Sequence, residues 1–154
     1  LIPLVILKAL HLESIPLYGD GLNVRDWLYV EDHVEALMLV ACKGVVGSSY
    51  CIGGYGERTN REVVEKICSV MDLRKPSDIH HSSFITAVKD RPGHDKRYSI
   101  DSSLITSELG WTPKYLFEDA LALTIDWYIK NVEWCNKVSA KGDYAGGRIG
   151  LNKL

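Results

Sequence analysis

The stretch "NVRDWLYVEDHVEALMLVACKG" (residues 23–44) passes from a strand pattern directly into a helix pattern. Arg25 to Val30 has the aromatic and branched side chains typical of a strand. From Glu31 to Lys43 the apolar residues follow the i, i+3, i+4, i+7 spacing of an amphipathic helix, which begins with acidic residues and stops at Gly44. The expected apolar face consists of Val34, Leu37, Met38 and Ala41. This succession indicates a chain of mixed class.

The residues before this stretch continue the alternation of helix and strand. Leu1 to Leu10 is expected to form a buried or half-buried helix, in which Pro3 is tolerated because it lies in the first turn. Ile15 to Tyr18 has the pattern of a short extended segment, and "GDG" (19–21) that of a turn. We therefore predict that the two short strands around these glycines form a hairpin or a kinked edge ribbon.

The residues after the stretch repeat the pattern. A helix should begin at Thr59 or Asn60, because Glu62 stands near the position that completes a capping box. Another should begin at Asp101 and end at Gly110. Further expected elements are strands at Ser48–Gly54 and Phe84–Val88, and a long helix over Leu116–Val138 with Leu116, Ala120, Leu123, Trp127 and Trp134 on one face. The predicted fold class is α/β with α+β character, a small domain of helices and short strands.

The composition is that of one ordinary globular domain. The chain has 154 residues, of which 46% are hydrophobic and 25% are charged, and its formal net charge is -2. This near balance argues against a nucleic-acid partner, which usually requires an excess of basic residues on one face, and favours a small anion. We expect residues 1–141 to form the domain and the glycine-rich residues 142–154 to be a flexible tail.

Metal and membrane sites have no support in the sequence. The histidines His80 and His81 are adjacent but have no acid or cysteine at metal-ligand spacing. The apolar opening "LIPLVILKAL" (1–10) is too short to span a membrane and lacks the features of a signal peptide. No CxxC pair occurs, and reduced thiols in a cytoplasmic protein are expected for the widely spaced Cys42, Cys51, Cys68 and Cys135.

The motifs of a cofactor-binding or catalytic domain are absent from the sequence. No strand is followed by GxGxxG, and the nearest glycine cluster, "IGGYGER" (52–58), has a different spacing. No GxSxG, HExxH or Tyr-xxx-Lys occurs. Because the chain also opens at Leu1 within an expected helix and without a methionine, we expect it to be a fragment that has no catalytic residues and binds no cofactor by itself.

A basic loop and a strand arginine are the candidate anion-binding groups. In "VKDRPGHDKRY" (88–98), Arg91 and His94 can converge on one anion across a Pro-Gly turn. The alternative is a solvated loop whose cations pair with Asp90 and Asp95. Arg25 lies in an otherwise apolar strand, where an unpaired buried guanidinium is costly. It must therefore either pair with a neighbouring acid or point into a cleft that binds an anion.

Three further side chains have both a functional and a structural interpretation. Tyr18 and Trp27 flank the glycine turn and are placed to stack on a flat ligand, although an aromatic residue in a strand more often belongs to the core. Asn60 is either the cap of its helix or an amide that reaches a ligand from the helix N-terminus. The residues alone thus indicate an anion-binding α/β domain without its own catalytic set.

Five strings resemble, in order and separation, the C-terminal part of the dTDP-glucose 4,6-dehydratases, a family of the extended short-chain dehydrogenase/reductase group. They are "LIPLVI", "PLYGDGLNVRDWLYVEDHVEAL", "GGYGERTNREVVEKIC", "VKDRPGHDKRYSID" and "ELGWTPKYLFEDAL", and they extend from Leu1 to about Trp134. The resemblance implies a lyase that uses retained NAD to form a 4-keto-6-deoxy sugar, as in rhamnose synthesis. It also implies that the Rossmann part, with its NAD loop and catalytic residues, lies N-terminal to this sequence.

The resemblance further implies a binding site for a nucleotide diphospho-sugar such as dTDP-glucose. In this interpretation Arg25 holds the diphosphate, and the loop of Asp90, Arg91 and His94 lines the same site. A tail tyrosine of the family corresponds to Tyr144 only with a shorter spacing, and Cys51 stands where the family usually has asparagine. The remaining implied substrate contacts are Leu1, Pro16, Leu17, Tyr18 and Asn60.

The sequence is also compatible with two other functions. One is a non-catalytic nucleotide-sugar-binding module, and the other is a fragment of a UDP-sugar epimerase or decarboxylase, which base preference would distinguish. As a separate chain the protein is expected to have no dehydratase activity. It is also expected to expose an apolar face, and therefore to associate, as in a homo-oligomer.

Overall fold

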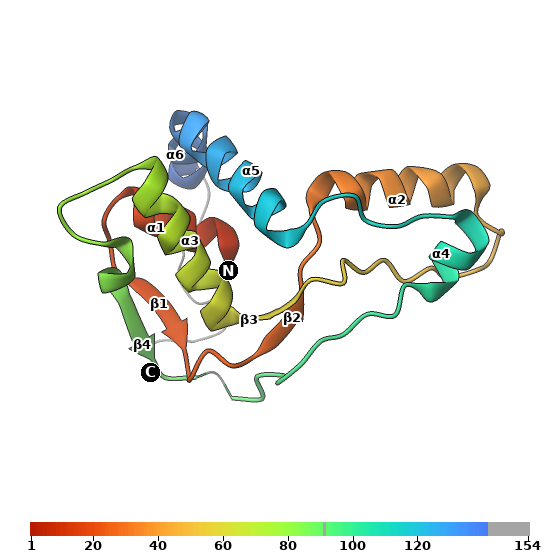
Figure 1. Cartoon of the computed structure of the whole chain (residues 1–154), viewed down its shortest axis with the longest axis horizontal. Helices are drawn as coiled ribbons and strands as arrows, with labels where there is room; N and C mark the ends of the chain where they lie inside the picture. The colour runs from red at the N-terminus through yellow and green to blue at the C-terminus, as the bar shows by residue number, and fades with distance from the viewer. Residues whose placement is uncertain (91, 142–154) are drawn as a thin grey trace.

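The computed structural model describes residues 1–90 and 92–141, in which helices and short strands alternate (Figure 1). This arrangement confirms the predicted fold class. Arg91 and residues 142–154, including Tyr144, lie outside the described residues, so the expectations for them stay predictions. In chain order the elements are α1 (Ile2–Leu10), β1 (Ile15–Tyr18), β2 (Val24–Asp26), α2 (Val30–Lys43), β3 (Glu57–Thr59), α3 (Asn60–Arg74), the 3-10 helix η1 (His81–Phe84), β4 (Ile85–Val88), α4 (Ser103–Leu109), α5 (Phe117–Lys130) and α6 (Val132–Lys141).

Most of the buried residues lie in a body formed by α1, α3, α5 and the β1–β4 pair (Figure 1). The two strands are parallel, with Ile15 beside Ile85 and Tyr18 beside Val88. The three helices contact one another and bury their apolar stripes, since apolar residues at helical spacing share one face. The buried cluster of the body comprises Val5, Ile6, Ala9, Ile15, Leu17, Val63, Val64, Ile67, Cys68, Met71, Leu121 and Ile125.

The hairpin predicted around the glycine turn is wrong. Gly19 and Gly21 do form a turn, with φ of 60° and 72°, values that favour glycine. However, the strands on either side belong to two different two-stranded sheets. β1 takes β4 as its partner, whereas β2 pairs antiparallel with β3, from Val24 beside Thr59 to Asp26 beside Glu57.

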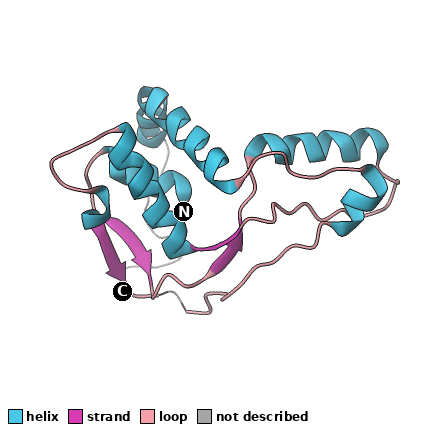
Figure 2. Cartoon of the chain, in the orientation of Figure 1, coloured by secondary structure: helices cyan, strands magenta, loops and turns pink. Residues whose placement is uncertain are grey.

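A second, smaller unit projects from the body as an arm that contains α2 and α4, and Figure 2 shows the loops that connect it to the body. The buried cluster of the arm is formed by Ala36, Ile105 and Trp111. Asp32 on α2 is only 1% exposed, and its carboxylate accepts hydrogen bonds from the backbone N–H groups of Lys114 (3.0 Å) and Tyr115 (3.2 Å). These bonds tie α2 to the segment that leads into α5.

The helix predicted for α2 is confirmed, but its apolar stripe does not form a core. Val34, Leu37 and Met38 are each at least half exposed, and the side of α2 that packs inward presents Ala36 instead. An exposed stripe of this kind is uncommon on a monomer because it leaves apolar surface in water.

The two other predicted helix starts and ends are close to those observed. Thr59 caps α3 in a complete capping box: its hydroxyl accepts from the Glu62 N–H, and the Glu62 carboxylate accepts from the Thr59 N–H. α4 begins at Ser103, where the Asp101 carboxylate accepts from the Ser103 N–H at 2.9 Å, and it ends at Gly110 in the left-handed conformation.

The single long helix predicted over Leu116–Val138 is divided in two. Asn131 separates α5 from α6, and both its backbone N–H and its side-chain amide donate to the Trp127 carbonyl (3.0 and 2.8 Å). Of the five residues assigned to one face only Ala120 is buried, because α5 faces the core with Leu121 and Ile125. The strand predicted over Ser48–Gly54 is also wrong, since β2 pairs with residues 57–59 and leaves 48–54 irregular.

None of the helices in the described part of the chain combines the length and the apolar composition needed to cross a membrane.

Candidate functional site

The short strand β2 is held on both of its edges. On one side it pairs with β3. On the other side the basic loop continues the ladder: the Val24 N–H donates to the Lys96 carbonyl at 2.8 Å, and the Tyr98 N–H donates to the Val24 carbonyl at 3.0 Å. The predicted strand arginine and the predicted basic loop, about 70 residues apart in sequence, are therefore brought together.

Arg25 lies at the centre of this cluster. Its guanidinium donates through Nη1 to the Val24 carbonyl (2.6 Å) and through Nη2 to the Asp95 carbonyl (2.9 Å). It also lies over the ring of Tyr98, with 4.2 Å between the guanidinium carbon and the ring centroid. No ion pair among the described residues includes Arg25, so its charge is held by carbonyl dipoles and an aromatic face rather than by a carboxylate.

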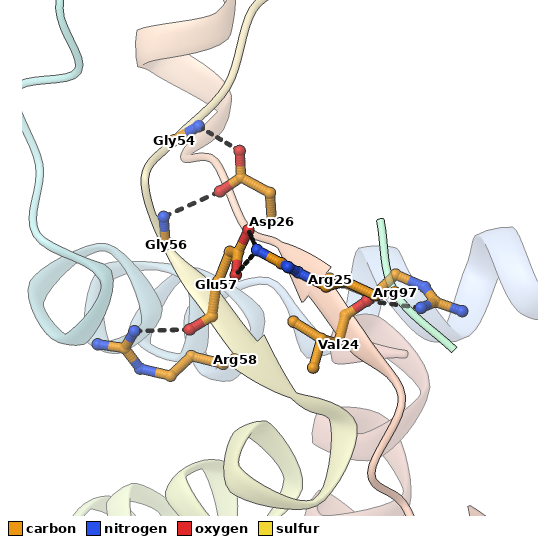
Figure 3. A network of polar contacts seen from close by, with 8 residues as sticks. All are labelled: Val24, Arg25, Asp26, Gly54, Gly56, Glu57, Arg58 and Arg97. Atoms are coloured by element: carbon orange, nitrogen blue, oxygen red, sulfur yellow. Dashed lines mark hydrogen bonds and ion pairs between the residues drawn. The ribbon is translucent and has the colours of Figure 1, made fainter. Parts of the chain in front are cut away.

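The neighbouring acid, Asp26, binds backbone groups instead of Arg25. Its two carboxylate oxygens accept hydrogen bonds from the backbone N–H groups of Gly54 and Gly56, both at 2.9 Å (Figure 3). A Cβ atom at Gly54 or Gly56 would lie 2.3 or 2.5 Å from the Trp27 carbonyl oxygen, which essentially no side chain tolerates. This packing against Asp26 and Trp27 explains the glycine cluster, and it also removes Asp26 as a partner for Arg25.

Two other arginines near β2 show how an arginine is neutralised in this molecule (Figure 3). Arg58 stands opposite Arg25 in the β2–β3 register, donates to the Glu57 carbonyl at 2.8 Å, and pairs with Glu118 at 3.4 Å. Arg97 binds both carboxylate oxygens of Glu57 at 2.9 Å, which lowers the pKa of Glu57 and raises that of Arg97. Arg25 differs from both because, within residues 1–90 and 92–141, it forms no ion pair with a carboxylate.

His94 and Asp90 form the next part of the site. His94 Nδ1 lies 2.7 Å from Asp90 Oδ1, and the side chain of His94 is only 6% exposed. The Asp90 carboxylate lies against the glycine turn, where a Cβ atom on Gly19 would come within 2.9 Å of it. The loop that follows β4 is thus docked on the turn that follows β1.

The remaining predicted site residues that the structure describes lie at the start of α1, on β1 and at the start of α3. Asn60 is the first residue of α3, and its N–H donates to the Asn23 carbonyl at 3.0 Å. Because Thr59 caps the helix, the side chain of Asn60 is not needed for that purpose. Leu17 is 2% exposed and belongs to the core, whereas Pro16 and Tyr18, on the same strand, are half-buried. Leu1 precedes α1 and is partly exposed.

An apolar cavity of about 540 Å³ lies elsewhere, between the start of α1, residues 27–31 and α5. Trp27 lines it, so this residue belongs with the apolar groups rather than with the cation cluster. The ring of Tyr29 is 4.7 Å from that of Tyr115 at its edge. Among the described residues that line this cavity there is no cationic side chain. Arg25 and His94 are therefore better placed to bind an anion. We therefore take the polar cluster, not the cavity, as the candidate site.

A metal centre finds no support in residues 1–90 and 92–141, where no group of three or more potential ligands occurs. His80 and His81 both contact the Asp72 carboxylate, at 3.0 and 2.6 Å. The hydrogen bond from the His81 N–H is the main reason that the pKa of Asp72 is lowered to about 2. This cluster has the geometry of a structural clasp between α3 and η1.

The sequence pointed to Arg25 and His94 but missed Tyr98 and Asp95 as neighbours of Arg25. In the sequence Tyr98 is only the end of the basic loop, and the expected partner group of Asp95 is its carboxylate, whereas in the structure its backbone carbonyl binds Arg25. The available signal was an aromatic residue one position beyond a run of cations, which is a frequent neighbour of a guanidinium.

Comparison with solved structures first defines the class of protein: the fold is that of a part of nucleotide-sugar dehydratases and epimerases. The dTDP-glucose 4,6-dehydratase of Streptomyces venezuelae, solved with NAD and TYD bound, matches with a TM-score of 0.79 and 42% identity over 87% of this chain and 39% of its own. The UDP-glucose 4-epimerase of Thermotoga maritima, solved with UDP-glucose, matches with a TM-score of 0.74 and 25% identity, over 85% of this chain and 40% of its own.

The chain belongs to the GDP-mannose 4,6 dehydratase family, whose model matches residues 1–124. Curated relatives named dTDP-glucose 4,6-dehydratase include one from Xanthomonas campestris pv. campestris (strain B100), 52% identical over 97% of this chain and 43% of the relative. Another, from Escherichia coli, is 50% identical over 98% of this chain and 42% of the relative. These matches confirm the predicted resemblance, and the chain spans about two fifths of the length of these relatives.

Proposed function

We propose that this chain is the nucleotide-sugar-binding part of a dTDP-glucose 4,6-dehydratase, a lyase, and that residues 1–141 form this binding unit. The observation that carries the proposal is that the Arg25 guanidinium forms no ion pair in the part of the chain that the structure describes. A guanidinium that is already oriented by two carbonyl groups and an aromatic ring retains N–H donors for a diphosphate. Asn60 at the N-terminus of α3 and the His94–Asp90 pair would line the same site.

The thymidine nucleotide is proposed over a uridine nucleotide because of the relatives. Those near 50% identity are named dTDP-glucose 4,6-dehydratase, whereas the UDP-glucose epimerase is 25% identical. A cytoplasmic location is part of the proposal, since the four cysteines are free and Cys42 and Cys51 are exposed, which suits a reducing compartment.

The described residues do not fit a binding site for NAD. The glycines that come nearest to a nucleotide loop, Gly54 and Gly56, are occupied by contacts with Asp26 and Trp27 of the same chain. The relatives solved with NAD extend well beyond the matched part. We therefore assign no step of the dehydratase reaction to a residue of this chain, and we expect no turnover of dTDP-glucose when NAD is added. Measurable turnover would contradict this part of the proposal.

Isothermal titration of the chain with thymidine diphosphate, and with uridine diphosphate as competitor, tests the proposal. We expect saturable binding that prefers the thymidine compound and that weakens at least about tenfold in Arg25→Ala, because a charged hydrogen-bond donor is lost. Arg58→Ala is the matched control, since Arg58 stands opposite on β3 but is neutralised by Glu118, and its affinity should be unchanged. Absence of binding, or equal losses in the two variants, would refute the assignment.

A further inference from the structure

We infer that Tyr98 is a positioning residue that holds the Arg25 guanidinium in place for the diphosphate, an inference that rests on the proposed function. The contact is direct: the guanidinium carbon of Arg25 is 4.2 Å from the centroid of the Tyr98 ring. At this distance a cation is attracted to the face of an aromatic ring, and the attraction grows when the pair is partly withdrawn from water.

The backbone fixes the ring in register with the arginine. Val24 and residues 96–98 exchange two hydrogen bonds, of 2.8 and 3.0 Å, which place Tyr98 beside the residue that precedes Arg25. The Tyr98 hydroxyl donates to the Asp95 carboxylate, while the Asp95 carbonyl accepts from Arg25 Nη2 at 2.9 Å. Tyr98 and Asp95 thus hold each other and enclose Arg25 from two directions.

Asn23, two residues before Arg25, also helps to hold this arrangement. Asn23 is 7% exposed, and its side-chain amide donates to the Asp95 carbonyl at 3.2 Å. The carbonyl that orients Arg25 is therefore itself held by a buried side chain, which restricts the movement of the loop.

The contacts of Arg25 leave N–H donors of its guanidinium available for a ligand. A guanidinium has five N–H groups in one plane, and within the described residues two of the five are used by carbonyl oxygens. The face of an aromatic ring attracts the cation as a whole, so this contact does not tie up the N–H groups pairwise as a carboxylate does. Tyr98 can therefore restrict the orientation of Arg25 while the other N–H groups remain for phosphate oxygens.

The second arginine–aromatic pair shows an arginine whose charge is neutralised by a carboxylate. Arg58 lies 5.4 Å from the ring centroid of Phe117, but Glu118 follows directly and takes the charge. A carboxylate would hold Arg25 equally well, yet it would compete with a diphosphate for the same donors. An aromatic ring and a carbonyl hold the side chain without this competition.

Affinities of Tyr98→Leu and Tyr98→Phe for thymidine diphosphate, measured by calorimetry, test the inference. Tyr98→Phe keeps the aromatic face and should bind within about twofold of the wild type, whereas Tyr98→Leu should bind roughly five- to thirtyfold more weakly, the range expected for loss of a partly desolvated stack. Phe117→Leu removes the ring of the other pair and is the matched control, with unchanged affinity. Equal binding by Tyr98→Leu and wild type would overturn the inference, as would an equal loss in Tyr98→Phe.

The NMR signal of the Arg25 Nε–H group supplies a readout that does not depend on ligand. Stacking should shift this proton upfield in the wild type and in Tyr98→Phe, and the shift should disappear in Tyr98→Leu, while the dispersed backbone amides report that each variant is folded. If wild type binds no nucleotide but the shift follows the ring, the proposed function fails and the hold of Tyr98 on Arg25 stands. If the shift is the same in all three proteins, the inference fails even where nucleotide binds.

Discussion

The body and the arm of this chain are built from helices of similar pattern but differ in how much of each helix is covered. In the body, α3 turns five apolar residues inward and they join a buried cluster of twelve. In the arm, the buried cluster has three members, and α2 leaves Leu37 and Met38 at least half exposed. Helical periodicity therefore identifies an apolar face but does not show whether another element covers it.

The largest expected effect is a loss of unfolding free energy when the core of the body is truncated. Comparing it with a truncation in the arm shows whether the body alone sets the stability of the chain. Ile67 on α3 and Ile105 on α4 are both fully buried, one in each cluster. Ile67→Ala should lower the free energy of unfolding by about 2–5 kcal/mol, because it leaves a cavity among many neighbours. Ile105→Ala should cost less, because the small cluster of the arm can collapse around the gap.

Urea denaturation followed by circular dichroism measures both losses. Hydrogen exchange distinguishes local from global opening: Ile105→Ala should speed exchange in α2 and α4 and leave α3 protected. A loss in Ile105→Ala as large as that in Ile67→Ala would show that the two regions unfold as one unit.

The second prediction concerns the bonds that hold the arm to the rest of the chain. Asp32→Ala leaves the N–H groups of Lys114 and Tyr115 without their buried acceptor and should cost about 1–3 kcal/mol of unfolding free energy. Glu35→Ala is the matched control, since Glu35 also contacts Lys114 but through an exposed ion pair, which should contribute under about 0.5 kcal/mol. Thermal melts of the two variants give the difference, and equal melting temperatures would count against the tether.

The third prediction uses pH to separate the body from the arm. Asp72, on α3, has a pKa of about 2, below its ordinary 3.8, chiefly because the His81 N–H of η1 donates to its carboxylate. A pKa that is lower in the folded state stabilises the fold above about pH 4, and this contribution is lost as the pH falls toward 2. Its size should be about 1–2 kcal/mol.

Urea unfolding of wild type and Asp72→Asn at pH 6 and at pH 2.5 tests this expectation. The stability difference between the two proteins should be large at pH 6 and should shrink at pH 2.5. Asp101, whose pKa is lowered by the hydrogen bond from Ser103 in the arm, is fully exposed, so Asp101→Asn should show a much smaller pH dependence. A difference for Asp72→Asn that is the same at both pH values would contradict the assignment.

The smallest effect on stability is expected on the exposed face of α2. Leu37→Glu should leave the free energy of unfolding within about 0.5 kcal/mol, because Leu37 is half exposed. It should nevertheless reduce self-association, since apolar surface drives association. Sedimentation velocity over a range of concentrations measures this, with Leu73→Glu on the exposed side of α3 as the control. If both variants associate as strongly as the wild type, the exposed face of α2 is not the surface through which the chain self-associates.

Local signals in the sequence were sufficient for most helices. Thr59 and Glu62 predicted the start of α3, and Gly110 predicted the end of α4, because capping depends on residues a few positions apart. Strand pairing depends on distant residues, so the glycine turn suggested a hairpin although β1 pairs with β4. Asn131 ends α5 through hydrogen bonds to Trp127, an interruption that an apolar pattern does not reveal.

The cationic residues of the candidate site could be predicted from the sequence, but the residues that contact them could not. The sequence offered two alternatives for Arg25, and the structure excludes Asp26 as its partner because Asp26 binds the N–H groups of Gly54 and Gly56. Tyr98 could not be assigned, because a ring stacks on a guanidinium only when the ladder between Val24 and residues 96–98 brings them into register.

The parallel pairing of β1 with β4 also has a consequence for the order of folding. Ser14 and Thr86, next to and within these strands, are 72 positions apart, and β2, α2, β3 and α3 all lie between them. The entropy of closing such a loop is lost before the contacts of the strand pair are gained, which slows folding. Helices α1 and α3 of the body can pack early, but this strand pair joins late, after β2, α2, β3 and α3 have been synthesised. During that interval the apolar face of α2 is already in water, so dilution should favour recovery of the native chain over aggregation.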